Sequence, residues 1–228
     1  MIDFFMVGGT FNPGGDGVTR AFTDRLDRRR INVRYVAYPG TAQFGDSVPA
    51  GERALANAID RSNAASQMVG GFSQGAIIAG NVAAKRPLAG CALIADPLRA
   101  EGTEPLNRGV GGYGILGSRR VLPTWLWQVA AAGDPISALV KGSPLRGLGD
   151  VAEFASQNPD VWVRGMLDKA QHNGFQPWWN PAYWRDWGTA AGWLNNYLTQ
   201  GRHTAAYVDE GLCAQLATKV NQAAARRP

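Results

Sequence analysis

Five short apolar segments limit most strongly how this chain of 228 residues can fold. They are mostly continuous rather than alternating in polarity, which is typical of strands covered by helices on both faces. Segments with helical periodicity lie between most of them. The pattern predicts an α/β fold with a doubly wound, mainly parallel sheet of about five strands. The expected strands are Ile2–Val7, Val33–Tyr38, Gln67–Gly70, Cys91–Ala95 and Trp125–Ala131.

The helical periodicity predicts three helices among the strands and one near the end of the sequence. They cover Val18–Arg30, Pro49–Arg61, Gln74–Lys85 and about 209–225. The basic run Arg28-Arg29-Arg30 closes the first helix, where cations suit the helix dipole. We therefore interpret the run as a helix end rather than as a nucleic-acid site.

The region 144–200 differs in character, because it contains no convincing strand. Asn158-Pro159 and Asn180-Pro181 each combine a capping side chain with a proline suited to a first helical turn. We expect one domain over residues 1–228, with 144–200 as a helical, lid-like or linker-like insertion. The insertion is rich in tryptophan: Trp162, Trp178, Trp179, Trp184, Trp187 and Trp193.

The composition limits the classes of protein to which the chain can belong. With 45% hydrophobic and 18% charged residues, the chain is of the soluble globular type, and its net charge of +5 is a bias toward anionic surfaces rather than a site. Cys91 and Cys213 lie far apart and fit neither a disulfide framework nor a paired-cysteine metal site. The start, MIDFFMVGG, lacks the basic region and the apolar length of a signal peptide or a membrane span, so we expect a first strand there.

The sequence GFSQG at 71–75 has the spacing G-x-S-x-G. This spacing can occur by chance, so the elements predicted on either side of it decide whether it indicates a catalytic serine. A predicted strand ends at the glycines before it, and a predicted helix begins at Gln74. A strand, a sharp turn and a helix are what a serine nucleophile at such a turn requires, which favours Ser73 as the nucleophile.

Two backbone amides are candidates to stabilise an oxyanion. Gln74 begins a helix whose N-terminal amides point at the serine, and the glycine-rich loop after the first strand offers Thr10 or a neighbour. That loop lacks the lysine and serine or threonine ending of a phosphate-binding loop. The dinucleotide-like spacing over Gly109–Gly117 has no strand before it and no helix after it, so we expect a flexible loop there.

A serine nucleophile needs a base and an acid. The chain contains only two histidines; His203, in a loop before the last helix, fits the base better than His172, which lies at a helix end in the insertion. Asp134 follows the last strand and is favoured as the acid, while Asp96, which follows the previous strand, stays a competitor or a brace for its loop. In serine hydrolases whose catalytic residues occur in the order serine, acid, histidine, both partners follow the serine in the chain.

The surroundings of Ser73, Asp134 and His203, with a helical insertion between acid and histidine, resemble the mycobacteriophage Lysin B enzymes. These are relatives of cutinases with a cutinase-like α/β-hydrolase fold, and the resemblance covers nearly the whole chain. Tyr38-Pro39, Phe44 and the following DSVPAGERAL also resemble the PE-PPE esterase domains of mycobacteria.

The resemblance implies a serine esterase with Ser73 as nucleophile, Asp134 as orienting acid and His203 as general base, without a metal or cofactor. It further implies cleavage of the ester between mycolic acids and arabinogalactan in the mycobacterial envelope, during host lysis by a phage. The protein would be made in the host cytoplasm without a signal peptide or transmembrane segment and act at the envelope after release. We expect no nucleic-acid partner and no obligate protein partner.

Alternatives stay open. A cutinase-like or PE-PPE lipase would act on other lipids, an acyltransferase would replace water by an alcohol, and a binding module would hold lipid or glycan without turnover. Tryptophan suits a boundary between lipid and water, yet it also packs insertions onto a core. The candidate substrate contacts are Trp178, Trp179, Trp184 and Trp187.

Overall fold

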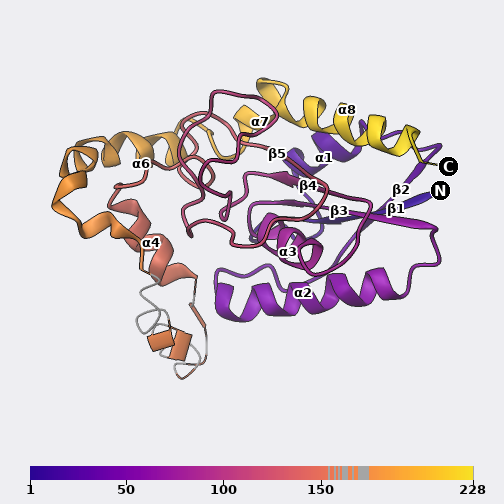
Figure 1. The fold of residues 1–228 in the computed structure, drawn as a ribbon, viewed down its shortest axis with the longest axis horizontal. Coiled ribbons are helices and arrows are strands. Elements are labelled where there is room, and N and C mark those ends of the chain that lie inside the picture. The colour runs from indigo at the N-terminus through magenta and orange to yellow at the C-terminus, as the bar shows by residue number, and fades with distance from the viewer. Residues whose placement is uncertain are drawn as a thin grey trace.

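The computed structural model describes residues 1–153, 155–156, 158, 160, 164–165, 167–168 and 175–227. At its centre lies one sheet of five parallel strands in the order β2-β1-β3-β4-β5 (Figure 1). The predicted doubly wound α/β fold is confirmed. The strands are β1 (Ile2–Val7), β2 (Ile31–Tyr35), β3 (Ser66–Phe72), β4 (Gly90–Ile94) and β5 (Leu126–Val129). β2 begins and ends earlier than expected, and β5 is shorter.

Helices cover both faces of the sheet (Figure 1). Helices α1 (Gly17–Thr23) and α8 (Leu212–Ala225) pack on one face, and α2 (Phe44–Asp60) and α3 (Gln74–Ala83) on the other. Because successive strand residues point to opposite faces, Phe4 joins the core under α1 and α8, while Phe5 joins the core under α2 and α3. The carboxyl ends of the parallel strands share one edge, so the loops that follow them gather there.

The first helix is shorter than the expected Val18–Arg30 for a tertiary reason. Asn221 on α8 accepts a hydrogen bond from the Asp27 amide and donates one to the Arg25 carbonyl, both at 2.9 Å. These backbone groups are therefore engaged by another helix rather than by a continuation of α1. Arg28–Arg30 lie in the turn before β2, and the prediction that they close a helix was wrong.

Two further helix boundaries differ from expectation. The helix expected over Pro49–Arg61 begins at Phe44, so its proline lies inside α2 at the cost of one helical hydrogen bond. The helix expected over about 209–225 is α8, which begins three residues later at Leu212, and a separate short helix, α7 (Ala205–Asp209), precedes it, with Gly211 between them. The φ of Gly211 is +74°, which a glycine adopts without strain.

Between β5 and α7 the described elements are helical: α4 (Leu145–Ala152), the 3₁₀ helices η1 (Pro177–Trp179) and η2 (Pro181–Thr189), and α6 (Ala190–Leu198). The Asn180 side chain accepts a hydrogen bond from the Ala182 amide at 2.9 Å, which is the expected cap of η2. Pro159 and Trp162 lie outside the described residues. Among the helices that are described, none combines the length and the apolar character that a bilayer span requires.

A buried arginine anchors α4 to the rest of the molecule. The Arg146 guanidinium donates to the Gly114 carbonyl at 2.8 Å and to the Gln176 side chain at 2.7 Å, and lies 3.4 Å from the centre of the Tyr113 ring. Burial lowers the pKa of Arg146 to about 10, so it stays charged at neutral pH. The segment 109–117 is a loop, as expected. It contains Tyr113 and Gly114, which make two of these contacts with Arg146.

Candidate active site

A sharp turn between β3 and α3 presents Ser73 at the carboxyl edge of the sheet. Its φ of +55° and ψ of −120° are unfavourable for a residue with a side chain, so the surrounding structure must impose them. A Cβ on Gly71 would lie 2.1 Å from the Gly75 carbonyl oxygen, and a Cβ on Gly75 would lie 2.1 Å from that of Val7. Both glycines of the G-x-S-x-G spacing are therefore required by backbone packing.

His203 and Asp134 reach Ser73 from two other loops. Asp134 follows β5, and His203 lies just before α7. His203 Nε2 lies 2.9 Å from Ser73 Oγ, and His203 Nδ1 lies 3.2 and 3.3 Å from the two carboxylate oxygens of Asp134. The structure thus brings the three side chains into one line of hydrogen-bond contacts.

Asp134 is fully buried and has several donors. Its carboxylate accepts hydrogen bonds from the Tyr207 hydroxyl at 2.6 Å, the Ser137 hydroxyl at 2.8 Å and the Ile136 amide at 2.9 Å. Burial by itself raises the pKa of Asp134, but His203 and these donors outweigh it and leave the pKa below its ordinary value. Asp134 is therefore a carboxylate at neutral pH. Tyr207 and Ser137 carry no sequence signal for this role.

Two aromatic rings hold the imidazole of His203 in place. Phe72 stacks on it with ring centres 5.2 Å apart, and Tyr197 packs at 5.6 Å. Phe72 immediately precedes Ser73, whereas Tyr197 comes from α6. The insertion therefore contributes directly to the site. The sequence analysis did not single out Tyr197, because only the folded chain brings α6 to His203.

The two residues expected to supply oxyanion donors both lie close to Ser73. Gln74 is the first residue of α3, so its N–H has no acceptor within the helix. Thr10, from the loop after β1, lines the same cavity as Ser73. Within the described part of the chain, neither amide donates a hydrogen bond. The role of these two amides as oxyanion donors stays a prediction.

The side chain of Gln74 has a structural role that the sequence did not reveal. It is fully buried; its Oε1 accepts from the Ser47 hydroxyl at 3.1 Å, and its Nε2 donates to the Thr41 carbonyl at 2.8 Å. These bonds join the segment after β2 to the first turn of α3. Gln74 therefore stabilises the turn with its side chain.

Asp96 has a different partner from the one a catalytic acid needs. Both of its carboxylate oxygens lie 3.1 Å from Arg119 Nη2, and one accepts from the Leu98 amide at 3.0 Å. Asp96 and Arg119 are almost completely buried. The geometry matches the alternative in which Asp96 braces the loop after β4.

The two candidate tryptophans whose side chains the structure describes, Trp178 and Trp179, lie away from the cavity at Ser73. Trp178 packs against Gly147 of α4, where an added Cβ would lie 3.2 Å from its ring, and its indole N–H donates to Asp150 at 3.3 Å. Trp179 is exposed. Neither is among the described residues that line the cavity at Ser73. The side chains of Trp184 and Trp187, and the whole of His172, lie outside the described part of the structure.

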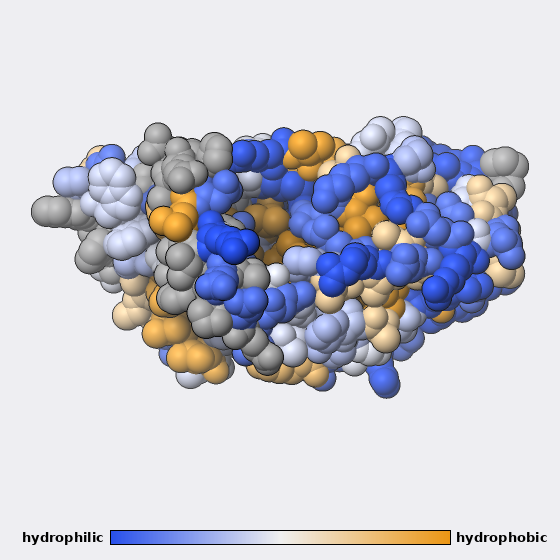
Figure 2. All heavy atoms as spheres, turned by 90° about the horizontal axis from the view of Figure 1, so that it is seen from below, coloured by the Kyte–Doolittle hydropathy of each residue, from blue (hydrophilic) through white to orange (hydrophobic). Residues whose placement is uncertain are grey.

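Ser73 opens into a small cavity of about 170 Å³. Apart from Ser73 and His203, its walls are mainly apolar and come from the core loops and from the insertion. Seen from below, this side of the molecule is hollowed near its middle, with apolar residues on the floor and polar residues around the rim (Figure 2). The other lining residues are Thr10, Phe44, Pro97, Ile115, Leu116, Ile136, Leu148, Gly149, Ala152 and Tyr197.

Two solved structures have a similar fold. The crystal structure of lysin B from mycobacteriophage D29 is 18% identical with a TM-score of 0.54, and the match covers 76% of this chain and 88% of that one. A cutinase-like protein from Cryptococcus sp. is 16% identical with a TM-score of 0.50, covering 77% and 95%. The fold is that of a cutinase-like α/β-hydrolase. The chain matches no protein-family model and no curated protein.

Gly75→Ala should destabilise the protein by more than about 2 kcal/mol, because the new Cβ meets backbone rather than a flexible side chain. The measurement is the urea unfolding midpoint followed by circular dichroism. Gly192→Ala in α6 is the control, since a Cβ there meets nothing within 4 Å and should be neutral or mildly stabilising. Equal midpoints for the two variants would contradict this account of the turn.

Proposed function

We propose that the chain is a serine esterase, with Ser73 as nucleophile, His203 as general base and Asp134 as the acid that orients the histidine. The observation that carries the proposal is the line of contacts from Ser73 Oγ to His203 Nε2 and from His203 Nδ1 to Asp134. The unusual backbone conformation of Ser73 supports it as well. A fold that only held lipid or glycan would not need this strain beside a buried carboxylate.

In the proposed reaction, Ser73 Oγ attacks the ester carbonyl while His203 Nε2 accepts its proton. The negative charge that develops on the carbonyl oxygen is stabilised by the Gln74 and Thr10 amides. Asp134 accepts a hydrogen bond from His203 Nδ1 and stabilises the imidazolium. His203 then gives the proton to the departing alcohol. Water attacks the acyl-enzyme while His203 accepts its proton, and His203 returns that proton to Ser73 Oγ as the acid departs. No metal or cofactor takes part in this scheme.

Ser73→Ala should lower esterase activity on the order of 10⁴-fold or more, because the oxyanion donors alone support only residual catalysis. A fluorophosphonate probe should label the wild-type protein at Ser73 and leave the variant unlabelled. Hydrolysis of a nitrophenyl ester and mass spectrometry of the labelled peptide are the two measurements. Full activity in Ser73→Ala, or a wild type that the probe does not label, would favour a non-catalytic binding module.

Asp134→Asn and Asp96→Asn make the same chemical change at two buried carboxylates. Asp134→Asn should lower kcat about 10⁴-fold, because the amide no longer selects the correct histidine tautomer. Asp96→Asn should leave activity per folded molecule within tenfold, but reduce the free energy of unfolding by about 3 to 5 kcal/mol, since Arg119 would stay buried without its counter-charge. The reverse ranking of the two activities would assign the acid to Asp96.

We further propose the natural substrate: the ester that joins mycolic acids to arabinogalactan in the mycobacterial envelope, cleaved during phage lysis. The sequence resemblance to Lysin B enzymes supports this choice, and the fold likeness to lysin B of mycobacteriophage D29 agrees with it. The protein would be made in the host cytoplasm and reach the envelope after release. Residues 144–200 would then be an insertion within a single hydrolase domain.

The main alternative is a cutinase-like lipase or esterase that acts on other lipids, which the likeness to the Cryptococcus protein supports equally well in fold. Short nitrophenyl esters do not separate the two. Purified mycolylarabinogalactan does: the proposed enzyme should release free mycolic acids, detected by thin-layer chromatography, and Ser73→Ala should release none. Turnover of triglycerides without release of mycolic acids would select the lipase.

A further inference from the structure

A second cavity of about 310 Å³ lies beside the cavity at Ser73. Phe44 and Leu116 line both. Neither His203 nor Tyr197 is among the described residues that line the second cavity. We call its apolar part the trough and define it by five residues: Phe44, Val48, Ile77, Leu98 and Leu116.

The trough is formed by separate parts of the chain. Phe44 and Val48 belong to the first turns of α2, Ile77 to α3, and Leu98 and Leu116 to the loops after β4. Ile77 and Leu116 are otherwise buried, and the other three are half-buried. Without an occupant, the trough therefore leaves apolar surface in contact with water.

The chain just after α4 is bonded to the start of α2, beside the trough. The Gly45 amide donates to the Ala155 carbonyl at 2.9 Å, and the Ser156 hydroxyl donates to Asp46 at 2.7 Å. On the core side, an added Cβ at Gly149 of α4 would lie 2.4 Å from the Ile115 carbonyl oxygen. The segment from Gly149 to Ser156 is thus held by direct contacts at both of its ends. The trough is therefore a fixed feature of the fold rather than a gap between loops.

The reaction geometry decides which half of an ester can enter the trough. The departing alcohol oxygen must lie within hydrogen-bond reach of His203 Nε2, and the carbonyl oxygen must face the amides of Gln74 and Thr10. The remaining substituent of the carbonyl carbon is the acyl chain, which must point away from His203. The trough is the apolar space next to the Ser73 cavity whose described lining includes neither His203 nor Tyr197.

We propose that the trough binds the acyl chain of the ester and sets the preference of the enzyme for medium-length or longer chains over acetate. This inference rests on the proposed esterase function and deepens it. Each methylene that enters the trough leaves water for an apolar environment. The preference should therefore rise with chain length until the trough is filled.

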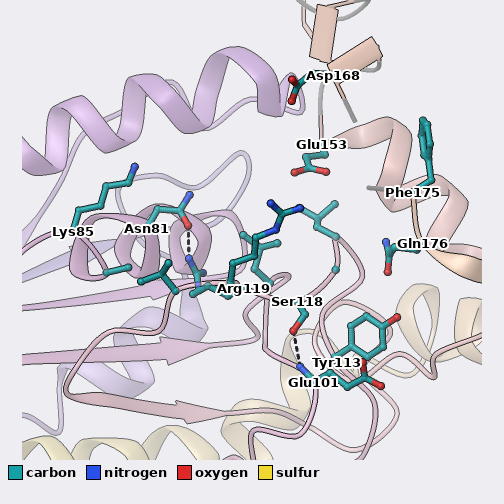
Figure 3. A pocket seen from close by; sticks show the side chains of 16 residues that line it. Asn81, Lys85, Glu101, Tyr113, Ser118, Arg119, Glu153, Asp168, Phe175 and Gln176 are labelled. Atoms are coloured by element: carbon teal, nitrogen blue, oxygen red, sulfur yellow. Dashed lines mark hydrogen bonds between the residues drawn. The ribbon is translucent and has the colours of Figure 1, made fainter. Parts of the chain in front are cut away.

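Beyond the trough the lining becomes polar. Asn81, Leu98, Leu116 and Glu153 are shared with a larger cavity of about 880 Å³. Figure 3 shows Asn81, Lys85 and Arg119 on one side of that cavity and Glu153 and Asp168 on the other. Because the larger cavity adjoins the trough at these residues, we expect that a chain that outgrows the trough can extend into it. The gain per methylene should level off there rather than reverse.

The experiment compares p-nitrophenyl esters from acetate to decanoate, each below the concentration at which it forms micelles. In the wild type, kcat/KM should rise with each added methylene. The rise per methylene should be at most about fourfold, which is the factor equivalent to about 0.8 kcal/mol per buried CH₂. Val48→Trp should lower the ratio of decanoate to acetate kcat/KM at least tenfold. Leu98→Trp fills the trough from another segment and should do the same.

Arg53→Trp is the matched control, since it adds the same bulk at an exposed position of α2 and should keep the wild-type ratio. A ratio of two rates on one preparation does not depend on the folded fraction. A second series, acetate esters of increasingly long alcohols, tests which half of the ester enters the trough. The dependence of kcat/KM on alcohol length should be the same in the wild type and in Val48→Trp.

Three results would overturn the assignment. A wild-type ratio near one, or equal ratios in Val48→Trp and Arg53→Trp, would show that the acyl chain lies elsewhere while esterase activity on acetate stands. An effect of Val48→Trp on the alcohol series alone would reverse the orientation. A wild type that hydrolyses no ester at all would remove the proposed function, and the trough assignment with it.

Discussion

The close approach of backbone to backbone around Ser73 is the constraint on which the site depends. Gly71 lies against the Gly75 carbonyl, and Gly75 lies against the Val7 carbonyl of β1, with no room for a side chain at either position. This packing forces the chain to leave β3 and enter α3 within one residue. It holds Ser73 at the sheet edge in a strained conformation.

The remaining groups reach that point through long-range contacts. Burial raises the pKa of Asp134, but the adjacent His203 and the Tyr207 hydroxyl outweigh it, so Asp134 keeps its charge inside the protein. Tyr207 comes from the helix that directly follows His203. One short segment thus carries both the imidazole and a donor to its carboxylate partner. Because Phe72 stacks on the ring of His203, the turn at Ser73 also orients the histidine.

The insertion acts on the site in a different way from the one its tryptophans suggest. Composition draws attention to a lipid-facing role for Trp178 and Trp179, yet the first packs on α4 and neither lines the described cavity. The insertion instead contributes Tyr197 beside His203 and apolar residues of α4 beside Ser73. Tryptophan content reports that a segment has apolar surface to bury, but it does not report against which neighbour.

By itself the sequence determined the fold class, because five continuous apolar runs separated by helical periods fit few arrangements other than a covered parallel sheet. It also singled out Ser73, since the two glycines and the adjoining strand and helix are local features. Only the tertiary structure decided which carboxylate meets His203, for Asp96 and Asp134 both follow strands and differ in their distant partners, Arg119 and Tyr207. The end of α1, where Asn221 binds the backbone, likewise depends on segments that are far apart in the chain. The same is true of the role of the Gln74 side chain and of the trough. Local periodicity carries no information about which distant segments touch.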